Sequence, residues 1–101
     1  MKAVRIHEFG GPEVLKIEEV PEPTIRPGDV LIQTEAAGVN YADVMTRIGM
    51  YPIRGLPITP GLEVAGRIVK AGDAVADFKA GDRVVAMLNA GGYAERVAAA
   101  A

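Results

Sequence analysis

Ala37-Gly38-Val39-Asn40-Tyr41-Ala42-Asp43 is the stretch that decides how the middle of this chain folds, because it contains the change from a strand to a helix. Asn40 is a favourable helix N-cap, and Asp43 then falls in the first turn, where a negative charge suits the helix dipole. The apolar residues that follow recur at helical spacing: Tyr41, Val44, Met45 and Ile48. The pattern predicts one short helix over residues 41–48, which Gly49 ends.

Short strand candidates separated by glycine and proline surround this helix. They span residues 1–7, 15–20, 30–39, 62–70, 83–88 and 93–97. Residues 15–20 alternate apolar and charged, so one face of that strand is expected to pack. Pro27-Gly28-Asp29 places proline and glycine where a type II turn has them. The whole pattern is typical of a small sandwich or barrel, so we expect a mainly β domain with one short helix.

Length and composition limit the classes of protein to which this sequence can belong. Its 101 residues are enough for one small domain over residues 1–101. The formal charge of −2 and the absence of a basic run disfavour a nucleic-acid partner. No apolar run approaches the roughly 20 residues that cross a bilayer, and the first residues lack the apolar block of a signal peptide. We therefore expect a cytoplasmic protein without a membrane partner.

The residues that usually hold transition metals are nearly absent. The chain contains no cysteine, which rules out disulfides, thiolate nucleophiles and sulfur ligands. Its single histidine, His7, has only Glu8 beside it. A zinc or iron centre is therefore not expected. No Gly-x-Gly-x-x-Gly motif appears either, so the sequence predicts no Rossmann domain.

Seven short landmarks in a fixed order connect the sequence to a known family. They are Met1-Lys2-Ala3-Val4, Pro27-Gly28-Asp29-Val30, Gly38-Val39-Asn40-x-x-Asp43, Arg47-x-Gly49-x-Tyr51, Pro60-Gly61-x-Glu63-x-x-Gly66, Gly81-Asp82-Arg83-Val84 and Gly91-Gly92-Tyr93-Ala94-Glu95. Over nearly its full length the chain resembles the N-terminal, GroES-like domain of the zinc-free quinone oxidoreductases. These form the zeta-crystallin-like branch of the medium-chain dehydrogenase/reductase superfamily. The resemblance implies a partly open GroES-like β-barrel with one short helix.

The same resemblance implies that the chain binds no zinc. In the zinc alcohol dehydrogenases of the superfamily, a cysteine ligand stands at the position of Asn40 and a histidine ligand at that of Leu62. A proton-relay hydroxyl stands at that of Ala42. None of the three residues present here can perform the corresponding metal chemistry.

Members of the resembling family bind NADPH between this domain and a Rossmann domain, and transfer hydride to a quinone or an activated alkene. The resemblance therefore implies the substrate-binding domain of an NADPH-dependent quinone or enone reductase. Because the dinucleotide fingerprint is missing, we expect the chain to stop before its nucleotide-binding domain and to be inactive alone. We expect this chain to be monomeric and the parent protein to be a homodimer.

The resemblance also assigns candidate site residues, each with a simpler structural alternative. Asn40 is the candidate for stabilising a developing oxyanion beside the cofactor, or it only caps the helix. Tyr51 is a catalytic and substrate-binding candidate, or an ordinary loop tyrosine. Asn40 and Met45 are the cofactor-binding candidates; the alternative for Met45 is a buried helix residue. The remaining substrate-binding candidates are Asp43, Leu62 and Met87; the alternative for Asp43 is a partner of the helix dipole.

Two other functions remain compatible with the residues. One is the corresponding domain of an enoyl-thioester reductase, which resembles this chain and also lacks zinc. The other is a non-catalytic, GroES-like binding or co-chaperonin-like module, because a fold does not determine a function.

Overall fold

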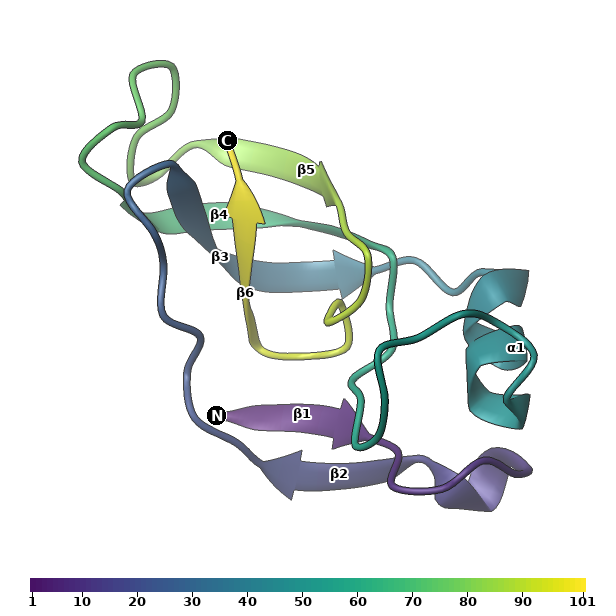
Figure 1. Cartoon of the computed structure of the whole chain (residues 1–101). Helices are drawn as coiled ribbons and strands as arrows, with labels where there is room; N and C mark the ends of the chain where they lie inside the picture. Colours follow the sequence, from purple (N-terminus) through teal and green to yellow (C-terminus); the bar gives the residue numbers. More distant parts are fainter.

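Strand β3 (Asp29–Ala37) lies at the centre of the structure, a computed structural model that describes residues 1–101. It belongs to a four-stranded antiparallel sheet of order β5-β4-β3-β6 (Figure 1). The neighbours of β3 are β4 (Glu63–Ala71) and β6 (Arg96–Ala100), and β5 (Arg83–Met87) forms one edge. The expectation of a mainly β domain is confirmed.

A second, two-stranded sheet lies below the first in Figure 1. It pairs β1 (Lys2–Arg5) with β2 (Lys16–Glu19), and a 3-10 turn, η1 (Pro12–Val14), lies between them in the chain. The two sheets meet at an isolated bridge from Ala3 to Ala94. They do not close into one continuous sheet, so the predicted partly open GroES-like barrel is confirmed.

The core is formed by side chains of the neighbouring strands β3, β4 and β6. β3 pairs Ile32 with Ile68 of β4 on one side and with Val97 of β6 on the other. Two register shifts along the β3–β4 pair bend β3. The bend allows β3 to pair with two neighbouring strands that run at different angles. The six buried core residues are Val30, Ile32, Val64, Ile68, Val97 and Ala99.

Helix α1 (Tyr41–Ile48) has the bounds that the sequence predicted, and Gly49 ends it in the left-handed conformation with φ +85°. A buried position on the helix was the simpler alternative for Met45, and the structure places Met45 as half-buried rather than buried. The residues of α1 that are buried are polar: Asp43 and Thr46. Tyr41 is 76% exposed and Ile48 is 40% exposed, whereas Val44 and Met45 are half-buried, so the chain covers only part of the apolar side of the helix.

Three local predictions need correction. The last strand begins at Arg96 rather than Tyr93, because the preceding residues hydrogen-bond to β1 instead. The alternating β2 does not bury its apolar face, since Ile17 is 75% exposed. The turn after Arg26 exists and is closed by the Asp29 N–H at 3.0 Å, but Gly28 has no positive φ, so it is not type II.

No helix of the structure has the length and apolar character required to span a membrane.

Candidate functional site

Segments that are distant in sequence meet where β3 ends, β4 begins and β5 ends. Antiparallel pairing brings these three strand ends to one side of the sheet, next to α1 (Figure 1). The Gly38 N–H donates to the Glu63 carbonyl oxygen at 3.2 Å, and the Leu88 N–H donates to the Leu62 carbonyl oxygen at 2.7 Å. The backbone therefore fixes the spacing between these strand ends.

Asp43 is the central polar residue of this region. Asp43 is only 7% exposed, and its carboxylate accepts three hydrogen bonds. Oδ2 accepts from the Asn40 N–H at 2.9 Å and from the Tyr93 hydroxyl at 2.7 Å. Oδ1 accepts from the Gly61 N–H at 3.2 Å. One carboxylate thus joins the start of α1, the segment before β4 and the segment before β6.

Asn40 precedes the helix in an extended conformation, with φ −115° and ψ 158°. Asn40 and Asp43 form a capping box: the Asn40 N–H donates to the Asp43 carboxylate, and the Asn40 side chain faces the backbone N–H of Asp43. Capping uses the side-chain oxygen of Asn40, an acceptor. The side-chain amide nitrogen of Asn40 donates no hydrogen bond within the chain, so this donor is free to bind a group from outside the chain.

Tyr93 has a strongly perturbed hydroxyl. Burial, and then the hydrogen bond to the Asp43 carboxylate and the charge of that carboxylate, raise the pKa of Tyr93 well above its ordinary value. The phenol therefore remains protonated, and remains a donor, throughout the physiological pH range.

A hollow of about 450 Å³ opens on the sheet beside this region. It is mostly apolar, and Met87 lines it together with the half-buried Glu63, its partner across the β4–β5 pair. The Glu63 carboxylate lies over Gly38, in the space that a Cβ atom would need there. Leu62 is half-buried one residue away and does not line the hollow itself.

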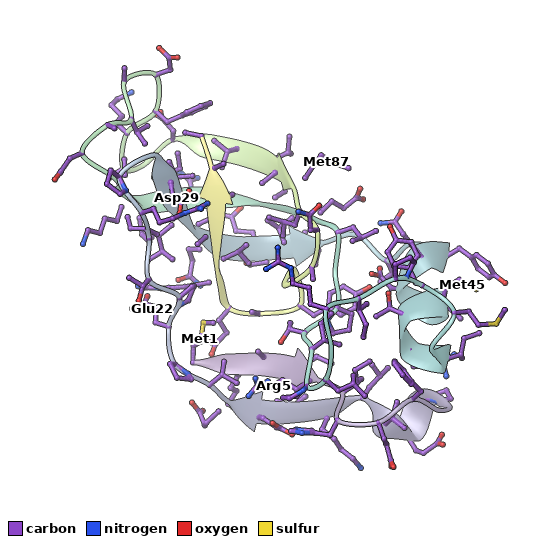
Figure 2. All side chains as sticks on the ribbon, in the orientation of Figure 1. Met1, Arg5, Glu22, Asp29, Met45 and Met87 are labelled. Atoms are coloured by element: carbon purple, nitrogen blue, oxygen red, sulfur yellow. The ribbon has the colours of Figure 1, made fainter.

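The structure does not bring all predicted site residues together. Asn40 and Asp43 are in direct contact, and Leu62 and Met87 lie at the adjoining strand ends. Neither Met45 nor Tyr51 lines the hollow. Figure 2 shows the Met45 side chain extending from α1 away from the sheets, far from the labelled Met87.

Tyr93 and Gly61 belong to this region, although the sequence did not indicate them as site residues. Both lie in recognised landmarks, Gly91-Gly92-Tyr93 and Pro60-Gly61, but nothing in either landmark says what the side chain or amide contacts. A tyrosine directly after two glycines is the one signal that the sequence offered.

Comparisons with known proteins agree with this architecture. The family model for the alcohol dehydrogenase GroES-like domain matches residues 26–101. Quinone oxidoreductase of Lama guanicoe is 48% identical, in an alignment covering 99% of this chain and 31% of the relative. The synaptic vesicle membrane protein VAT-1 homolog of Rattus norvegicus is 42% identical, covering 88% of this chain and 23% of the relative.

Solved structures give the same result. The Escherichia coli quinone oxidoreductase complexed with NADPH superposes with a TM-score of 0.94 at 35% identity, covering 99% of this chain and 31% of that one. The chain thus spans about three tenths of the length of the quinone oxidoreductases it matches. It belongs to the alcohol dehydrogenase GroES-like domain family, in the zeta-crystallin-like branch of the quinone oxidoreductases.

Proposed function

We propose that this chain is the substrate-binding domain of a reductase that transfers hydride from NADPH to a quinone or enone without zinc. The observation that carries the proposal is the Asn40 side-chain amide nitrogen, which donates to no group of the chain, at a backbone position that Asp43 holds. Asn40 is two residues from Gly38, which lines an apolar hollow. The names of the relatives support a quinone as acceptor, in preference to an enoyl thioester or a purely structural role. The Escherichia coli relative, a complex with NADPH, supports the choice of cofactor.

The residues present fit one end of that cofactor. An uncommitted amide nitrogen two residues from the lining of an apolar hollow suits a flat, uncharged ring that carries a polar group. No glycine-rich turn from a strand into a helix is available to hold a pyrophosphate, so that end requires a separate nucleotide-binding domain. Bound NADPH supplies the hydride.

In the proposed mechanism the Asn40 amide donates a hydrogen bond to the acceptor oxygen, which gains negative charge as the acceptor is reduced. We propose the Tyr51 hydroxyl as a second donor, from a loop residue that is 39% exposed and lies outside the lining of the hollow. Leu62 and Met87 provide an apolar wall for the acceptor ring. The candidate role of Met45 at the cofactor amide is not part of this mechanism, because its side chain extends from α1 away from the sheets. Solvent supplies the proton that the reduced acceptor takes up.

We further propose that the reductase is cytoplasmic, and that its partners are small molecules rather than nucleic acids or membranes. The formal charge of −2 without a basic run supports this. We propose that the 101-residue chain is a monomer and that the complete reductase is a homodimer.

The first prediction is that the chain alone does not oxidise NADPH in the presence of a quinone. The binding of the cofactor phosphates supplies much of the energy that orients the nicotinamide, and these residues cannot provide it. Steady-state assays with 1,4-benzoquinone measure this directly. A hybrid protein, in which residues 1–101 replace the matching part of the Escherichia coli enzyme, is expected to turn over. A hybrid that binds NADPH but reduces no quinone would refute the proposed function.

The second prediction is that the chain retains no zinc. Asn40 and Leu62 lack the thiolate and imidazole of a zinc site, and the structure contains no cluster of three histidine, cysteine or carboxylate residues. Metal analysis after dialysis is expected to find far less than one equivalent. Stoichiometric zinc that survives a weak chelator would contradict the zinc-free mechanism.

A further inference from the structure

We infer that Tyr93 is a positioning residue for Asn40 and acts through the carboxylate of Asp43. This inference rests on the function proposed above for Asn40. No part of Tyr93 is required to touch the acceptor or the cofactor. Its role is to fix the orientation of the carboxylate that holds the Asn40 backbone.

The inference starts from an oxygen atom shared by two donors. Asp43 Oδ2 accepts the Tyr93 hydroxyl at 2.7 Å and the Asn40 N–H at 2.9 Å. The other oxygen, Oδ1, accepts the Gly61 N–H at 3.2 Å. A carboxylate with donors on both oxygens cannot rotate without breaking at least one of these bonds. The Tyr93 hydroxyl is the shortest of the three contacts, so its loss removes the strongest restraint on Oδ2.

Tyr93 is itself anchored on a rigid part of the fold. Its N–H donates to the Pro60 carbonyl oxygen at 2.9 Å, and its carbonyl accepts from the Val4 N–H at 2.8 Å. These bonds place Tyr93 at the junction between the two sheets. The hydroxyl therefore reaches Asp43 from a fixed backbone, and the position of Asn40 is defined relative to the sheets rather than to α1 alone.

The contact is specific to this tyrosine. The chain contains three tyrosines, and the other two, Tyr41 and Tyr51, are 76% and 39% exposed. Neither of their hydroxyls forms a hydrogen bond within the chain, whereas that of Tyr93 bonds to a buried carboxylate. Tyr41 is therefore a suitable matched control. Its replacement by phenylalanine also removes a tyrosine hydroxyl, but one that faces solvent.

The direct test is amide hydrogen exchange of the 101-residue chain and its Tyr93→Phe variant. Positioning predicts that the amides of Asn40 and Gly61 exchange about 10-fold faster in the variant, because their common acceptor is released locally. The core amide of Ile68, bonded to the Asp82 carbonyl oxygen at 2.9 Å, is expected to change less than about 2-fold. Tyr41→Phe leaves all three unchanged. Equal acceleration at Ile68, or none at Asn40, would overturn the inference.

The functional test is a double-mutant cycle in the hybrid reductase. Tyr93→Phe alone is expected to lower kcat about 3-fold to 10-fold, with KM for NADPH changed less than about 2-fold. If Tyr93 acts through Asn40, the same replacement in an Asn40→Ala background has no further effect on kcat. A purely structural tyrosine lowers kcat by the same factor in both backgrounds, and that result would overturn the inference.

The cycle also separates this inference from the proposed function. If Asn40→Ala alone leaves kcat unchanged, the proposed role of Asn40 is wrong and the inference falls with it. If Asn40→Ala slows the reaction while the effect of Tyr93→Phe is additive, the role of Asn40 stands and only the positioning role of Tyr93 is lost.

Discussion

Gly61→Ala is expected to reduce the free energy of unfolding of the chain by about 3 kcal/mol or more. Gly61 has a φ of +111°, a conformation that costs an L-residue with a side chain about 1–2 kcal/mol. A Cβ atom there would also lie 2.7 Å from Gly92 Cα and 2.8 Å from the Tyr93 nitrogen. These are backbone atoms, which cannot move aside by changing a rotamer. Urea denaturation followed by circular dichroism measures the loss.

Gly81→Ala is the matched control for this experiment. Gly81 has a similar φ of +95°, but a Cβ atom there would meet nothing within 4 Å. Its replacement is expected to remove only the conformational part, about 1–2 kcal/mol. If the two variants lose the same stability, the close approach of Gly61 to Gly92 does not contribute. The comparison matters for the site, because Gly61 also donates to Asp43.

Local signals explain why the helix was predicted with its correct ends. Asn40 before the helix and Gly49 after it are capping residues whose effect depends on a few neighbouring residues. Strand positions were also found within a few residues, since alternation is likewise local. The start of β6 was misplaced because Ala94 bridges to Ala3, a contact between opposite ends of the chain.

Periodicity indicates the spacing of apolar residues but not what covers them. Ile17 and Tyr41 follow strand and helix spacing and are nevertheless 75% and 76% exposed. The side of α1 that packs against the rest of the protein is polar, because the Asp43 carboxylate accepts hydrogen bonds from Gly61 and Tyr93. A single sequence contains no signal for that choice of face.

The candidate site could be predicted from the sequence only where its contacts are local. Asn40 and Asp43 are three residues apart, so their relation follows from helix geometry. Tyr93 is 50 residues from Asp43, and only the fold brings its hydroxyl to the carboxylate. The two missed residues, Tyr93 and Gly61, are therefore ones whose contacts with Asp43 depend on tertiary structure.

Asn40→Ala in the hybrid reductase is expected to lower kcat about 10-fold to 1,000-fold, the usual effect of removing one preorganised donor from a developing oxyanion. KM for NADPH is expected to change much less, because the cofactor is held chiefly by its phosphates. The stability of the variant distinguishes the alternative role. A purely capping Asn40 predicts a loss of about 1 kcal/mol of stability with normal turnover, whereas the oxyanion role predicts the loss of kcat whatever the change in stability.

Asn40→Asp makes the distinction sharper. Aspartate is as good an N-cap as asparagine and has nearly the same shape, so a purely structural role predicts normal stability and normal turnover. Its carboxylate cannot donate a hydrogen bond, and its negative charge opposes the charge that develops on the acceptor oxygen. A catalytic Asn40 therefore predicts that the aspartate variant is folded, binds NADPH and is at least as slow as the alanine variant. Wild-type kcat in Asn40→Asp would exclude the oxyanion role and leave Asn40 as a structural residue at the start of α1.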